Sequence, residues 1–198
     1  MIARDRATRR KLVDLLWPAG RGAQALRLAS LAVLGSLLLW ASAKVHVPFY
    51  PVPMTLQTGA VLLLGVAYGW RLALATVLLY LAEGAVGLPV FSGTPERGIG
   101  LAYMAGPTGG YLASYPFVAV IAGLAAERAR GWLMLGVGLL LAVVVNYALG
   151  LGWLASFVGL QKAAALGAAP FVLGDIVKLL LVTALSEVGL ARLRQRLG

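Results

Sequence analysis

The sequence contains no cysteine, and His46 is its only histidine among 198 residues. The absence of cysteine excludes disulfide bonds and thiolate metal ligands. A single histidine excludes both a multi-histidine metal centre and a histidine proton relay. We therefore expect no resident metal and no cofactor in this chain.

Charged residues are also scarce, at 12% of the chain, whereas 61% of the residues are hydrophobic. Soluble domains are roughly one quarter charged and about half apolar. The surface of this protein is therefore expected to be apolar as well, which indicates that its solvent is a lipid bilayer. The formal net charge of +10 is therefore interpreted first as a signal of membrane topology and only second as a signal of nucleic-acid binding.

The N-terminal stretch, residues 1–27, carries seven Lys and Arg residues against two Asp residues. It is too long and too charged for a typical signal peptide. We interpret residues 1–24 as a basic cytoplasmic arm, and residues 193–198 as a cytoplasmic tail. Anionic lipid headgroups suffice to explain the basic arm. A nucleic-acid-binding tail is the less favoured alternative, and no nucleic-acid partner is expected.

Six apolar segments follow the arm, and together they predict an all-α integral membrane domain of six transmembrane helices over residues 25–192. A spanning helix needs about 20 apolar residues, and the second segment falls short of that length. The segments cover about 25–45, 55–70, 71–90, 108–126, 132–154 and 170–191.

The distribution of positive charge predicts the orientation of these helices. With six spans both termini lie on one side, and thirteen of the seventeen Lys and Arg residues then fall on that side. Only Lys44, Arg97 and Lys162 fall on the other side, and Lys178 lies within a span. Positive residues favour the cytoplasmic side, so both termini are predicted to be cytoplasmic.

Polar residues within the apolar segments are the candidate site. Asp175 and Lys178 stand three residues apart in the last segment, a spacing that places both on one helix face. Ionisable groups in a membrane are costly and suggest function. Gln57, Glu83 and Arg97 fall at a similar depth on the outer side, which predicts a polar pocket open to the outside. The alternative is that Asp175 and Lys178 only neutralise each other.

Two outer loops add to this prediction. Pro48, Pro51 and Pro53 stiffen a strap that either covers a ligand or anchors the chain at the membrane interface. The motif GPTGGY, residues 106–111, lacks the lysine of a phosphate-binding loop, so no ATP site is expected. The helix predicted over 25–45 has small residues at Ala25, Ala29 and Ala32, which permit close packing, either internal or against a partner.

Three ordered motifs resemble one known family: PVPMTLQTGAVLLLG, LLYLAEGAVGLPVFSG and GPTGGYLASYPFVAVIAGL. From about residue 29 to 186 the chain is similar to the BioY family, the biotin-specific substrate-binding (S) components of energy-coupling factor (ECF) transporters. The resemblance implies the ECF S-component fold, biotin as ligand, and the cytoplasmic membrane of a bacterium or archaeon. It also implies a transmembrane coupling subunit and ABC-type ATPases as partners, so that ATP is used by the partners alone.

The resemblance also implies roles for individual residues. Asp175 and Lys178 match the family's Asp-x-x-Lys, Arg97 matches a loop arginine, and Glu83 stands where the family often has Asn. Phe91 and Tyr111 would supply apolar walls for biotin. Small residues of the first helix pack on the coupling subunit in this family, which points here to Ala25, Ala29 and Ala32.

Two other function classes are alternatives to a biotin-capturing subunit. An integral-membrane enzyme would need a nucleophile with its base, or a metal cluster, and the sequence offers little for either. A channel or scaffold would need no ligand. The sequence does not decide between a monomer and a homo-oligomer, nor whether the protein transports without partners.

Overall fold

The computed structural model describes residues 24–47 and 50–197, with side chains up to residue 186. The basic arm predicted over 1–24 therefore lies outside the described residues, apart from Gln24. The segment predicted as a tail, 193–198, is helical as far as Leu197 and continues the last helix.

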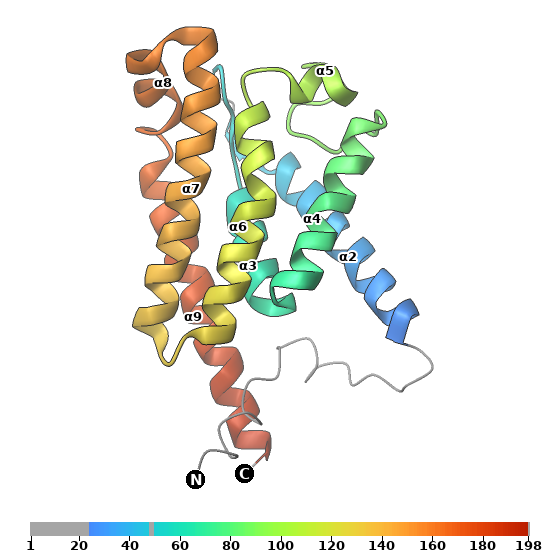
Figure 1. Cartoon of the computed structure of the whole chain (residues 1–198), viewed down its shortest axis with the longest axis vertical. Coiled ribbons are helices and arrows are strands. Elements are labelled where there is room, and N and C mark those ends of the chain that lie inside the picture. The colour runs from blue at the N-terminus through green and yellow to red at the C-terminus, as the bar shows by residue number, and fades with distance from the viewer. Residues whose placement is uncertain (1–23, 48–49, 198) are drawn as a thin grey trace.

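Each apolar segment predicted from the sequence largely coincides with one helix (Figure 1). The third of these helices ends at Ala85 rather than near residue 90, because the Gly- and Pro-containing loop begins there. The helices are α2 (Gln24–Lys44), α3 (Gln57–Tyr68), α4 (Trp70–Ala85), α6 (Gly109–Arg128), α7 (Trp132–Val158) and α9 (Val172–Leu197).

Shorter elements join these helices at one end of the molecule. They are the helices α5 (Gly100–Met104) and α8 (Leu160–Gly167) and a small antiparallel hairpin of β1 (His46–Val47) and β2 (Met54–Thr55). We call this end the loop end, and Figure 1 shows it at the top. The α3–α4 and α6–α7 turns, the start of α2 and the end of α9 lie at the opposite end (Figure 1).

The structure supports the prediction of six membrane spans only in part. Within the described residues, α2, α6 and α7 are long and apolar enough to cross a bilayer. The pair of α8 and residues 172–186 would make a fourth span, bent by 51°. The helix α3 has 12 residues and is therefore only about 18 Å long, shorter than a hydrocarbon core of about 30 Å.

Close approach between helices depends on small residues. α6 packs against α3, α4 and α7. A Cβ atom added at Gly65 of α3 would lie 2.6 Å from the Cβ atom of Ala122. A Cβ atom at Gly123 would lie 2.3 Å from the backbone nitrogen of Trp70. Only glycine permits these distances, and the pattern is typical of helix packing in membranes.

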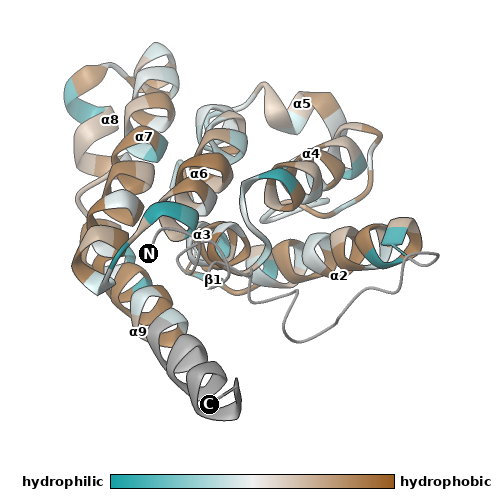
Figure 2. Cartoon of the chain, turned by 60° about the horizontal axis from the view of Figure 1, so that its bottom comes forward, coloured by the Kyte–Doolittle hydropathy of each residue, from teal (hydrophilic) through white to brown (hydrophobic). Residues whose placement is uncertain are grey.

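The outward faces of the helices are apolar. Figure 2 shows hydrophobic residues over most of the length of the long helices. On α7, the side chains of Leu140, Leu141 and Val144 are more than half exposed. Exposed apolar area on this scale is what a lipid-facing surface requires, because lipid tails and not water are its solvent.

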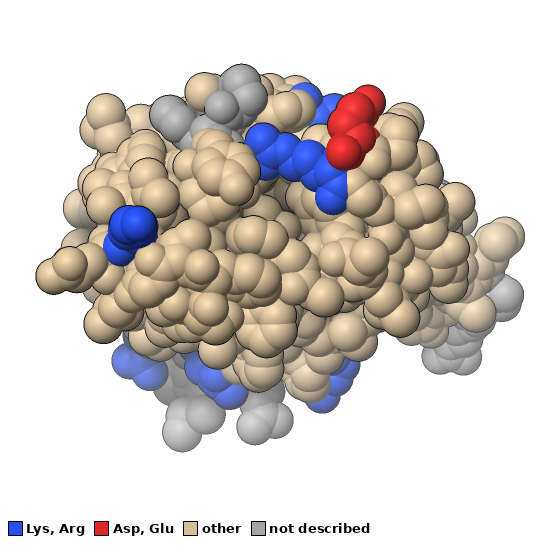
Figure 3. Space-filling model, turned by 90° about the horizontal axis from the view of Figure 1, so that it is seen from above, with Lys and Arg blue, Asp and Glu red and all other residues tan. Residues whose placement is uncertain are grey.

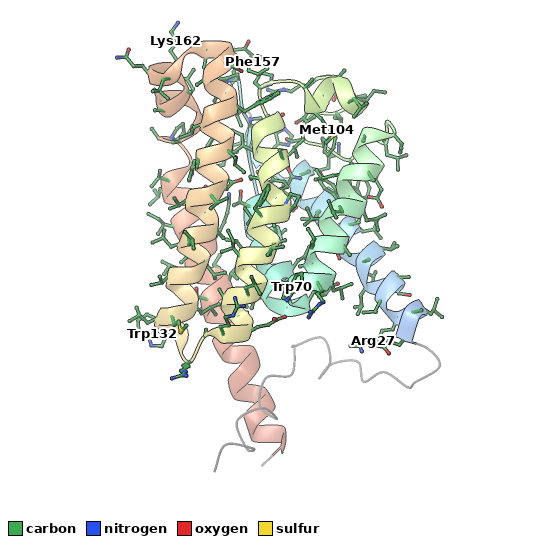
Figure 4. All side chains as sticks on the ribbon, viewed as in Figure 1. Arg27, Trp70, Met104, Trp132, Phe157 and Lys162 are labelled. Carbon is green, nitrogen blue, oxygen red and sulfur yellow. The ribbon has the colours of Figure 1, made fainter. Side chains whose placement is uncertain are left out.

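Aromatic residues mark both ends of α7. Trp132 lies at the end opposite the loops, at a level near that of Trp70, and Phe157 lies at the loop end (Figure 4). The rise of an α-helix separates Trp132 from Phe157 by about 40 Å. That separation agrees with a bilayer including its headgroup layers, where Trp is enriched.

Candidate ligand-binding site

A cavity at the loop end is the candidate site. Its empty volume, including space open to solvent, is about 520 Å³. Figure 3 views this end of the molecule, where few charged side chains appear on the surface. The lining residues are Val52, Pro53, Met54, Thr55, Gln57, Thr58, Ser92, Tyr103, Thr108, Tyr111, Leu112, Tyr115, Asn146, Tyr147, Phe171, Asp175 and Lys178.

The charged part of the cavity is the pair formed by Asp175 and Lys178. Asp175 lies in the first turn of α9, where the helix dipole favours a carboxylate. Lys178 Nζ donates to Asp175 Oδ1 at 2.8 Å. The side chain of Lys178 is only 11% exposed and that of Asp175 only 7%. Tyr147 of α7 donates its hydroxyl to Asp175 Oδ2 at 2.5 Å. Each carboxylate oxygen therefore has one protein donor and keeps a lone pair for a further donor.

The stem of Lys178 is accommodated by a glycine on the neighbouring helix. A Cβ atom added at Gly59 of α3 would lie 3.3 Å from Lys178 Cγ. The methylene groups of Lys178 thus pack along α3 while its ammonium group reaches back to Asp175. This arrangement holds the pair in one geometry, because the stem is confined by packing and the head by its hydrogen bond.

A chain of hydrogen bonds runs from the cavity to the loop that follows α4. Gln57 is 3% exposed, and its Nε2 donates to the Tyr80 hydroxyl at 2.7 Å. Tyr80 donates in turn to the carbonyl oxygen of Val90 at 2.9 Å. These two bonds hold the side chain of Gln57 in place at the start of α3 and link it through Tyr80 to the backbone of Val90.

Aromatic and amide side chains complete the wall. The hydroxyl of Tyr111 donates to the Gly167 carbonyl at 2.8 Å, which ties α6 to the end of α8. Gly150 of α7 makes room for this ring, because a Cβ atom there would lie 2.3 Å from Tyr111 Cε1. The Ser114 hydroxyl lies 2.6 Å from Asn146 Oδ1 and 2.7 Å from the carbonyl oxygen of Tyr111, and its single proton can be donated to only one of them.

Four of the seven predicted ligand residues line this cavity: Gln57, Tyr111, Asp175 and Lys178. The proline-rich strap contributes as well, through Val52 and Pro53. The structure therefore brings together side chains from α3, α6 and α9 that are far apart in the sequence.

The other three predicted residues do not line the cavity. Glu83 faces α2, where the Ser36 hydroxyl donates to its carboxylate. Phe91 is fully buried between Tyr80 and Tyr103, with ring centroids 5.5 and 5.1 Å away, and is a packing residue. Arg97 is exposed on the loop, and its stem lies against Gly93.

Reasoning from the sequence missed Ser92, Tyr103, Tyr115, Asn146 and Tyr147, all of which line the cavity. Asn146 had a usable signal, because it is an amide within the apolar run VVVNYALG and polar residues in membrane helices are often functional. Tyr147 had none, since a tyrosine in an apolar helix reads as an ordinary packing residue.

The three small residues predicted to contact a partner lie on α2. Ala25 and Ala29 are exposed, and Ala32 is half-buried. Large apolar side chains of the same helix are exposed beside them, among them Leu34 and Leu37 at 55% and 50%. In the described part of the chain, no group of three or more His, Cys, Asp or Glu side chains is placed to hold a metal ion.

Relatives of known name match most of the chain. A probable biotin transporter BioY of Pyrococcus horikoshii is 42% identical over 149 residues, covering 75% of this chain and 87% of the relative. The biotin transporter BioY of Thermotoga maritima is 35% identical over 157 residues, covering 79% and 90%. That of Rhodobacter capsulatus is 42% identical over 160 residues, covering 73% and 82%.

The fold also matches a solved structure. The S-component for biotin from an ECF-type ABC transporter superposes with a TM-score of 0.74 at 24% identity, covering 89% of this chain and 95% of that one. This likeness shows that the two chains share a fold. The sequence model of the BioY family matches residues 15–196, which is nearly the whole chain, and the protein therefore belongs to the BioY family.

Proposed function

We propose that this protein is the biotin-binding and biotin-uptake subunit, the S component, of an ECF-type ABC transporter in a bacterial or archaeal cytoplasmic membrane. Its relatives are named biotin transporters, which favours transport over an enzymatic role. The observation that carries the proposal is the hydrogen-bonded group of Asp175, Lys178 and Tyr147 in the wall of the cavity.

The chemistry of the cavity suits biotin. The ureido ring of biotin offers two N–H donors and one carbonyl acceptor, and its tail ends in a carboxylate. Asp175 retains lone pairs for an N–H group, and Lys178 retains N–H donors for a carbonyl or carboxylate oxygen. Apolar walls for the remainder of the ligand come from Val52, Leu112 and Phe171. Hydrogen bonds to charged groups in a buried site are the strong kind, so we expect a Kd in the nanomolar range, about −12 kcal/mol.

We further propose six membrane crossings with both termini in the cytoplasm. The start of α2 and the end of α9 lie at the same end of the molecule (Figure 1). The turns at that end carry Arg71, Arg128 and Arg130, as the positive-inside rule expects of a cytoplasmic side. The loop end with its cavity then faces outward, which is the side from which a vitamin arrives.

The exposed face of α2 is the proposed contact with a transmembrane coupling subunit. Ala25, Ala29 and Ala32 let another helix approach closely, and the energy for uptake would come from ABC-type ATPases bound to that subunit. A tagged form purified from its native membrane should carry both kinds of partner with it.

Calorimetric titration of the detergent-purified full chain with biotin tests the binding function. We expect saturable binding of one biotin per chain with a nanomolar Kd. The variant Asp175→Asn is the matched comparison, since it keeps the size of the side chain and removes its charge. Folded wild-type protein that gives no heat and no thermal shift with biotin would refute the proposed function.

A further inference from the structure

Ser92 is a buried polar residue whose side chain takes part in none of the hydrogen bonds described above. It lies in the loop between α4 and α5, lines the cavity and is only 3% exposed. Its hydroxyl oxygen is buried and has no hydrogen-bond partner among the described residues. Buried hydroxyl groups in folded proteins are nearly always hydrogen-bonded, so an unpaired one at a cavity wall points to a partner that is not part of the chain.

The backbone around Ser92 is held from three sides. The Tyr103 hydroxyl donates to the carbonyl oxygen of Ser92 itself at 2.7 Å. Tyr80 donates to Val90 at 2.9 Å. Lys44, at the end of α2, donates to the carbonyl oxygens of Phe91 and Thr94 at 3.1 and 3.2 Å. We call residues 90–94 the anchored loop, since helices α2, α4 and α5 all bond to it.

The ring of Phe91 fixes the anchored loop further. It stacks on Tyr103 with a centroid distance of 5.1 Å and fills the space left by Gly84, where a Cβ atom would lie 1.9 Å from Phe91 Cζ. Burial raises the pKa of the Tyr103 phenol, which keeps its proton on the donating oxygen at neutral pH. Ser92 is thus presented at a fixed place, and a pre-organised contact of this kind costs a ligand little ordering.

We propose that the Ser92 hydroxyl is a direct contact for the ligand and a determinant of its affinity. A hydroxyl group can donate and accept, so its partner is a polar group of the same small molecule that Asp175 and Lys178 hold. The ligand class is then a molecule with one polar group at α9 and another within reach of the anchored loop. Biotin, with a ureido ring and a separate carboxylate, is of this class. The inference rests on the proposed function for the identity of the ligand.

The test compares two serine variants in the detergent-purified full chain. Ser92→Ala should weaken biotin binding about tenfold, equivalent to about 1.4 kcal/mol. The midpoint of ligand-free thermal unfolding should be unchanged or higher, because the variant removes a buried hydroxyl that has no partner. Ser42→Ala is the control: Ser42 is also buried, at 7% exposure, but its hydroxyl is bonded to the Leu39 carbonyl within α2. It should leave the Kd for biotin unchanged.

The outcomes separate this inference from the proposed function. If wild-type protein fails to bind biotin, the proposed function fails. If wild type binds and Ser92→Ala keeps the same Kd, the function stands and the Ser92 contact is refuted. A variant that loses ligand-free stability along with affinity would also overturn the inference, because it would show that Ser92 acts only on the fold.

Discussion

The buried pair of Asp175 and Lys178 makes an unusually sharp prediction about stability. Its two side chains are 7% and 11% exposed, and their charged atoms are 2.8 Å apart. The substitution Asp175→Asn leaves the Lys178 ammonium group without its counter-charge among apolar helices. The double substitution Asp175→Asn with Lys178→Met removes both charges. The two variants therefore distinguish an uncompensated buried charge from the simple loss of one interaction.

The expected sizes differ enough to be measured. Removing one partner of a buried ion pair costs about 3–5 kcal/mol, whereas replacing the whole pair by uncharged groups is often nearly neutral. We expect Asp175→Asn to lower the free energy of unfolding by about 3 kcal/mol, and the double variant to recover about 2 kcal/mol of that loss. Both variants should bind biotin at least about tenfold more weakly, since the charged contacts are gone.

Reversible unfolding in mixed detergent micelles, followed by circular dichroism, measures these free energies. Lys162→Met is the control, because Lys162 is an exposed lysine on α8 and surface substitutions usually stay within about 0.5 kcal/mol. A double variant as unstable as Asp175→Asn would refute the reasoning. It would mean that the buried charge of Lys178 was not the source of the cost.

Three further predictions concern single positions. Tyr147→Phe removes the donor to Asp175 Oδ2 and should weaken biotin binding about tenfold by calorimetry; an unchanged Kd would contradict this. Gly84→Ala places a Cβ atom against the Phe91 ring and should lower the free energy of unfolding by about 1–3 kcal/mol. Thermal unfolding measures this change, and an unchanged stability would contradict the prediction. Ala29→Trp on the exposed face of α2 should abolish co-purification with partner subunits while leaving the Kd for biotin unchanged, and retained partners would exclude this face.

Periodicity and composition predicted the helices well because membrane helices are long apolar runs whose ends are marked by charge, glycine and proline. The turn at Gly69, where φ is +73°, was visible in the sequence as a break between two apolar segments. The short length of α3 was visible as well. The loop-end helices α5 and α8 were not predicted, since five and eight residues are too few for a periodic signal.

The sequence predicted the residues of the candidate site less completely than it predicted the helices, and the reason is geometric. Glu83 and Gln57 stand at similar depths in a sequence reading, yet Glu83 faces α2 while Gln57 faces the cavity. Depth along a helix can be counted from the sequence, but the direction of a side chain around the helix axis depends on how neighbouring helices pack. Phe91 does not line the cavity for a similar reason, because its ring turns inward to the space left by Gly84.

The sequence by itself determined that this is a helical membrane protein and that Asp175 and Lys178 share a helix face. Those properties follow from composition and from spacing within one segment. Only the tertiary structure decided that the Tyr147 hydroxyl donates to Asp175 and that Ser92 lines the cavity. Both depend on contacts between segments distant in the chain, which are fixed by the packing of several helices at once and are not encoded in any single stretch.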